Sequence, residues 1–184
     1  MSTLRWDLSE YATRGAILDA TLAALSEEER AAVEEGRDSA RVPEGHHHGL
    51  AEVLATIDGL DASDRVKEDM RGIYRILAEA EAAAHGCAVD ETHFHEVGNG
   101  EAVRNALGIC LAVEAVDPDE IVATAVQAGR GTVQCAHGEL AVPAPATAAI
   151  IARGIPVCER RLDGERCTPT SAAIILHFAN RFET

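Results

Sequence analysis

The spacing of hydrophobic residues changes at Gly86, and this change constrains the fold more than any other feature of the chain. Before Gly86, apolar residues recur at the three- and four-residue intervals of amphipathic helices. After it, β-branched runs such as Ile121 to Val126 alternate with helical stretches. We therefore expect an α/β or α+β fold in one compact domain over residues 1–184, mainly helical over 1–86 and mixed β-α over 87–184.

Capping residues predict several helix boundaries. Ser26 and Glu29 have the spacing of a capping box, Ser63 precedes a long apolar periodicity, and Pro145 suits the first turn of a helix. The pattern predicts helices over residues 9–25, 26–36, 50–57, 63–86 and 101–116, with two more beginning near residues 145 and 170. It predicts strands over residues 121–126, 132–135, 140–142 and 155–161, and a β-compatible segment over residues 87–97.

Composition excludes several classes of partner. The formal charge of -15 argues against nucleic acid and against anionic membrane surfaces, because both are bound by clustered Lys and Arg. The sequence contains no apolar run of signal-peptide or membrane-span length, so we expect a cytoplasmic protein. Five cysteines without a C-x-x-C pair do not suggest a disulfide framework. With 47% hydrophobic but only 3% aromatic residues, the core must consist mainly of aliphatic side chains.

Histidines cluster at two places in the chain. His93 and His95 form a His-x-His pair, which on an extended segment places both imidazoles on the same side, where they can share a metal ion. Glu96 could add an oxygen ligand or orient an imidazole. The equally weighted alternative is that one histidine packs in the core while the other bonds to backbone. His46, His47 and His48 lie in a glycine-flanked segment that could capture a metal, or could form an ordinary polar loop.

Two further segments carry chemical groups. Cys135 and His137 repeat the alternate spacing, so thiol and imidazole could face one site, although a buried cysteine is the favoured reading. The segment Thr168-Pro169-Thr170-Ser171 at a predicted helix start offers hydroxyls and free backbone N–H groups. Such a helix start can bind a phosphate or a carboxylate, and its commoner role is simple N-capping.

Four of these segments resemble, in the same order, the motifs of the nickel insertion protein family. They are His46-His47-His48, HFHEVG at 93–98, AHGELAVPAPAT at 136–147 and TPTSAA at 168–173. The resemblance implies insertion of Ni(II) into a pyridinium-type mononucleotide bearing two thiocarboxylate groups, with consumption of CTP. It implies metal ligands at His46, His47, His48, His93, His95, Glu96 and Glu101, with His95 and Glu96 catalytic. Substrate and phosphate contacts would fall to His137, Thr168, Thr170 and Ser171.

The chain departs from the family pattern at several positions. Two aspartates four residues apart become Glu101 and Asn105, which keeps an oxygen donor but removes one charge. Serine replaces glycine at Ser171, and the acidic residue of a Ser-Gly-Asp-Met stretch is missing from Thr13 to Ala16. Family members continue into a C-terminal domain associated with nucleotide binding and oligomer formation. Because this chain ends at Thr184, we expect CTP use only with a separate nucleotide-binding chain. Assembly of the chain into a homo-oligomer is compatible with the sequence.

Two other functions are compatible with the same residues. The chain could be a diverged enzyme that acts on a related nicotinate-type nucleotide, with His95 or Glu96 as acid or base. It could also be a non-catalytic module that binds metal and partners a separate catalytic chain. Turnover by metal-free protein would indicate the first of these. Failure of the chain to form a metallated product would indicate the second.

Overall fold

A computed structural model describes residues 1–44, 48–94, 98–135 and 138–183. The helices are α1 (Arg14–Leu22), α2 (Glu27–Asp38), α3 (Leu50–Asp58), α4 (Asp64–His85), the 3-10 helix η1 (Val89–Glu91), α5 (Gly100–Val116), α6 (Pro145–Ile151) and α7 (Pro169–Phe178). The strands are β1 (Thr3–Trp6), β2 (His48–Gly49), β3 (His93–Phe94), β4 (Glu120–Thr124), β5 (Gly129–Arg130), β6 (Thr132–Cys135), β7 (Gly138–Ala141), β8 (Gly164–Glu165) and β9 (Arg181–Glu183). The predicted α/β class is confirmed.

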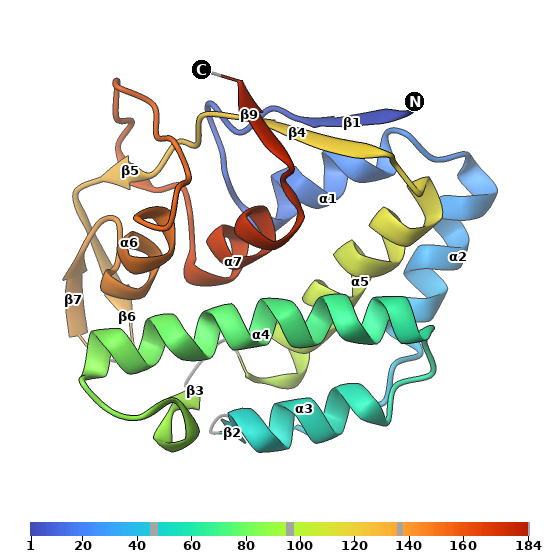
Figure 1. The fold of residues 1–184 in the computed structure, drawn as a ribbon, viewed down its shortest axis with the longest axis horizontal. Helices are drawn as coiled ribbons and strands as arrows, with labels where there is room; N and C mark the ends of the chain where they lie inside the picture. Colours follow the sequence, from blue (N-terminus) through green and yellow to red (C-terminus); the bar gives the residue numbers. More distant parts are fainter. Residues whose placement is uncertain (45–47, 95–97, 136–137, 184) are drawn as a thin grey trace.

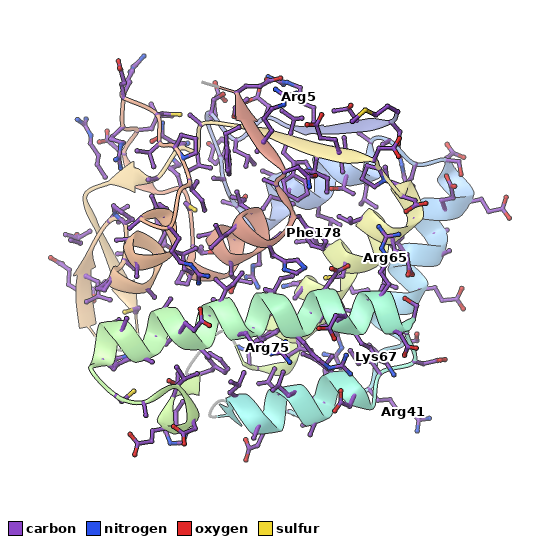
Figure 2. The ribbon with its side chains drawn as sticks, in the orientation of Figure 1. Arg5, Arg41, Arg65, Lys67, Arg75 and Phe178 are labelled. Atoms are coloured by element: carbon purple, nitrogen blue, oxygen red, sulfur yellow. The ribbon has the colours of Figure 1, made fainter. Side chains whose placement is uncertain are left out.

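A parallel sheet in the order β1-β4-β9 joins the two ends of the chain. Leu4 pairs with Ile121 and Val122 with Arg181, while the guanidinium of Arg5 donates to Glu183 at 3.1 Å (Figure 2). Figure 1 shows helices α1, α5 and α7 between this sheet and the long helix α4, with α3 packed on the other side of α4. Within the described residues, no helix is long and apolar enough to cross a membrane.

The core is built from small and branched side chains around a few aromatic rings. Trp6, Tyr74 and Phe94 are among its largest fully buried side chains, and most of the remaining core residues are aliphatic. The indole N–H of Trp6 donates to the hydroxyl of Thr21 at 3.1 Å, which satisfies a polar group that water cannot reach. Because bulky rings are few, the helices can pack closely. At Gly72, for example, the absence of a side chain leaves room for the ring of His177.

The predicted helix caps are confirmed. Ser26 and Glu29 form the reciprocal capping box, and the Ser63 side chain accepts from the N–H of Val66. Pro145 occupies the first turn of α6, and Gly86 ends α4 in the left-handed conformation that favours glycine. The strands predicted over residues 132–135 and 140–142 correspond to β6 and β7, which pair antiparallel as a hairpin.

Three sequence predictions differ from the structure. The expected strand over 155–161 is wrong: the segment makes only an isolated bridge between Val126 and Val157. The reason is the buried side chain of Gln127, which donates to the carbonyl of Arg160 and accepts from the N–H of Leu162, replacing a backbone ladder. The first helix starts at Arg14 rather than near residue 9, and strands β1 and β9 were not predicted.

Candidate functional site

Strands β2 and β3 bring the two histidine segments together. They pair antiparallel, with the backbone of His48 opposite Phe94 and that of Gly49 opposite His93. A Cβ added at Gly49 would lie 4.0 Å from Nδ1 of His93, so the imidazole of His93 lies beside the start of α3. Segments that lie 45 residues apart in the sequence therefore adjoin in space (Figure 1).

Phe94 anchors this pair of strands in the core. Its ring is 1% exposed and packs edge-on against Tyr74 of α4, with ring centroids 5.8 Å apart. A Cβ at Gly98 would come within 2.8 Å of Cβ of Phe94, so Gly98 packs directly against the Phe94 side chain. Because side chains alternate along a strand, burial of Phe94 leaves His93 exposed on the opposite side.

A cavity of about 590 Å³ opens where several helix ends meet. Its wall includes the carboxyl end of α4, the amino ends of α1, α5, α6 and α7, and the β6–β7 hairpin. Of the residues predicted to be functional, Glu101, Thr168 and Thr170 lie on this wall, together with Cys135. A volume of this size suits a small-molecule ligand.

The amino end of α7 supplies hydroxyls and a backbone N–H group to the cavity. Thr168 is the N-cap, and its hydroxyl accepts from the N–H of Ser171 at 3.3 Å. Ser171 is fully buried and is not among the described residues that line the cavity. Its hydroxyl accepts from the N–H of Thr168 at 2.8 Å, which completes a reciprocal capping box. Thr168 and Ser171 therefore cap the helix, whereas Thr170 lies on the cavity wall without a hydrogen bond to any described residue.

Metal-donor side chains line the same cavity. Glu81 and His85 stand one turn apart at the end of α4, with Nε2 of His85 3.5 Å from a carboxylate oxygen of Glu81. Glu101 in the first turn of α5 adds a carboxylate, and Cys135 is half-buried, with its thiol donating to the carbonyl of Gly138 at 3.4 Å. No three His, Cys, Asp or Glu side chains in the described parts of the chain gather closely enough to hold a metal by themselves.

Arg14, in the first turn of α1, is the cationic guanidinium on the described cavity wall. Its charge reaches the hydroxyl of Tyr74, whose pKa is raised by burial and lowered, in smaller measure, by Arg14. The side chain is half-buried. No hydrogen bond or ion pair joins its guanidinium to another described residue, which distinguishes it from Arg65, paired with Asp117 (Figure 2).

Several predicted site residues lie outside the part of the chain that the structure describes. These are His46, His47, His95, Glu96 and His137, and of His48 only the backbone is described. Their assigned roles as metal ligands, catalytic groups or substrate contacts stay predictions. His93 is described and exposed, and it is not among the residues lining the cavity.

The sequence analysis missed three cavity residues. Glu81 and His85 could have been found, because a carboxylate and an imidazole four residues apart in a predicted helix share one face. The helix that carries both residues was predicted over residues 63–86. Nothing in the sequence pointed to Arg14, since its place depends on pairing between segments more than 150 residues apart: Ala12 and Cys167.

The site thus combines transition-metal donors with helix amino ends that favour an anion. The chain belongs to the nickel insertion protein family, whose model matches residues 8–184. A relative from Citrifermentans bemidjiense named "putative nickel insertion protein" is 42% identical over 140 residues, which are 76% of this chain and 35% of the relative. One of the same name from Dictyoglomus thermophilum is 40% identical over 134 residues, 73% of this chain and 34% of the relative.

The chain therefore spans about a third of the length of the curated relatives that it matches. No solved structure matches it.

Proposed function

We propose that this chain is the metal-handling part of a nickel insertion protein and delivers Ni(II) to a pyridinium-type mononucleotide bearing two thiocarboxylate groups. The observation that carries the proposal is the pairing of β2 with β3, which joins the two histidine segments of the family pattern. Imidazole and carboxylate donors suit Ni(II) and bind it less permanently than a closed cage of thiolates. A protein that must release its metal requires this kind of ligand set.

The family motifs and the residues of the cavity wall together suggest how the transfer proceeds. His46 to His48 would collect nickel, and His93, His95 and Glu96 would hold it near the substrate. Glu101, Glu81 and His85 on the cavity wall offer further donors on the route into the cavity. The substrate's thiocarboxylate groups would then replace protein ligands, while Thr168 and Thr170 at the start of α7 bind the substrate phosphate.

Other parts of the activity also belong to the proposal. Consumption of CTP would require a separate nucleotide-binding chain or a further domain, and the relatives are long enough to carry one, since each is matched over only about a third of its length.

Nickel binding tests the proposal most directly. Ni(II) titrated by calorimetry into untagged protein should bind stoichiometrically, and the double variant His93→Ala, His95→Ala should lose that binding. Unchanged urea unfolding of the variant is the control for its fold. Unaltered nickel binding by a folded double variant would overturn the assignment.

A reaction assay separates the alternatives. Purified chain is mixed with Ni(II), CTP and the unmetallated precursor, and the metallated product is measured with and without a chain that supplies the missing part of the relatives. Product in either mixture supports nickel insertion. Turnover of a nicotinate-type mononucleotide by metal-free protein would instead indicate a diverged enzyme, and nickel binding without product in both mixtures would indicate a binding module.

A further inference from the structure

Helices α1 and α7 begin side by side, after two chain segments that run parallel. Ala12 and Cys167 form a parallel bridge, and the N–H of Ala12 donates to the carbonyl of Arg166 at 2.9 Å. Each helix starts two residues after its bridged residue, at Arg14 in one case and Pro169 in the other. The amino ends of both helices therefore contribute to the wall of the cavity, and each carries the partial positive charge of a helix start.

The groups at these two ends lack partners within the described chain. Thr170 is 2% exposed, lines the cavity, and neither its hydroxyl nor its backbone N–H bonds to a described residue. Pro169 has no N–H to offer, so the N–H of Thr170 is the first free donor of α7. The hydroxyl and the N–H of Thr170 are therefore free to donate to a ligand bound in the cavity.

Arg14 supplies the positive charge. In a chain of net charge -15, arginines readily find carboxylates, as Arg153 does with Glu79 at 2.9 Å. Arg14 is half-buried at the cavity and makes no such pair with any described residue. The carboxylates of Glu81, Glu101 and Glu165 also line the cavity, so an anion would be repelled without this guanidinium.

We infer that Arg14, together with the amino end of α7 at Thr170, forms a subsite for a phosphate monoester. A guanidinium and a helix N–H group are the donors that phosphate oxygens accept most strongly, and the Thr170 hydroxyl adds a third. The inference rests on the proposed function for the identity of the ligand, a mononucleotide whose ring would lie toward Glu101 and His85. Binding of the phosphate itself needs no nickel.

The test uses the metal-free chain of residues 1–184 and ribose 5-phosphate as the probe, with binding measured by calorimetry. We expect wild type to bind ribose 5-phosphate and not ribose. Arg14→Gln should weaken binding about tenfold or more, and Thr170→Val several-fold, because each removes a donor to a charged group. Arg153→Gln, which alters a surface ion pair, is the matched control and should bind as wild type does.

Three outcomes would overturn the inference. The first is that wild type does not bind ribose 5-phosphate, and the second is that folded Arg14→Gln binds it as tightly as wild type does. The third is binding of nicotinate in place of ribose 5-phosphate that depends on Arg14, because the site would then be a carboxylate site. If Arg14→Gln fails to fold, amide resonances of wild type decide: those of Thr170 and Arg14 should shift with ribose 5-phosphate, and unshifted resonances refute the subsite. Normal nickel binding with no phosphate binding refutes this inference and the phosphate contacts of Thr168 and Thr170, and it leaves the proposed nickel delivery standing. Phosphate binding without nickel binding refutes the proposed nickel delivery and leaves the phosphate subsite standing.

Discussion

The imidazole of His177 and the carboxylate of Asp69 join α7 to α4, with Nε2 of the histidine 2.8 Å from Oδ1 of the aspartate. The ring also stacks edge-on against Phe178, with centroids 4.7 Å apart, and lies directly over Gly72. Because both partners are only about a fifth exposed, this contact fixes the angle between the two helices whose ends line the cavity.

We therefore expect Gly72→Ala to destabilise the protein. The added Cβ would lie 2.5 Å from Cε1 of His177, and the ring cannot move aside without losing its bond to Asp69. Overpacking of this kind costs about 1–3 kcal/mol, which outweighs the gain of roughly 1 kcal/mol from alanine in a helix. Urea unfolding measures the difference. Gly59→Ala is the control, since its nearest atom is 3.6 Å away, and a Gly72→Ala protein as stable as wild type would contradict the prediction.

Thr21→Val should also destabilise the core. Its hydroxyl accepts from the indole N–H of Trp6 and donates to the carbonyl of Ile17 at 2.7 Å, and both side chains are fully buried. Valine keeps the shape but leaves the indole N–H unpaired, at a cost of about 1–3 kcal/mol. Far-ultraviolet circular dichroism during urea unfolding measures the loss in both backgrounds, because Trp6 is the single tryptophan of the chain and cannot serve as a probe once it is replaced. The loss should shrink in a Trp6→Phe background, and an equal loss there would show that the hydrogen bond is not its cause.

Stability should fall in alkaline solution because of two buried thiols. Burial raises the pKa of Cys167 to about 11 and that of Cys110 well above the usual value. The unfolded chain loses these protons near pH 9 while the folded chain keeps them, so the stabilisation is complete below about pH 9 and decreases as pH rises toward 11. Each thiol can contribute a slope of up to about 1.4 kcal/mol per pH unit. The urea midpoint, measured at pH 8, 9 and 10, should fall with rising pH, and it should fall less steeply for Cys167→Ala than for wild type. Equal slopes for the two proteins would contradict the prediction.

Glu81 and His85 should contribute to nickel affinity. Their position on the cavity wall, one turn apart, offers nickel a carboxylate and an imidazole. We expect Glu81→Gln combined with His85→Ala to raise the Kd for Ni(II) about tenfold, in the range seen when groups around a metal site are lost. Calorimetry on untagged protein measures this. Glu79→Gln is the control, because Glu79 lies on the same helix but pairs with Arg153, and this variant should bind nickel as wild type does. An unchanged Kd for the double variant would show that Glu81 and His85 do not take part in nickel binding.

Local sequence determined the helices and their ends. Ser26, Ser63 and Thr168 bond to N–H groups three residues away, so their caps depend on neighbours that the sequence places beside them. The hairpin of β6 and β7 is equally local, because glycines with positive φ at Gly131 and Gly138 stand at its ends. The family motifs could also be recognised from the sequence, because each is a run of consecutive residues. The single-domain organisation over residues 1–184 stays a prediction.

The tertiary structure alone decided which distant segments meet. The sequence identified His48 and His93 as candidate ligands but did not predict that their segments are neighbours. Strands β2 and β3 pair where Phe94 packs against Tyr74 of α4. The same holds for β1 and β9, which are short and acquire strand geometry through pairing with β4. Arg14 lines the cavity because Ala12 pairs with Cys167. Local sequence patterns do not predict such a contact, because its free energy arises from burial between segments that are far apart in the chain.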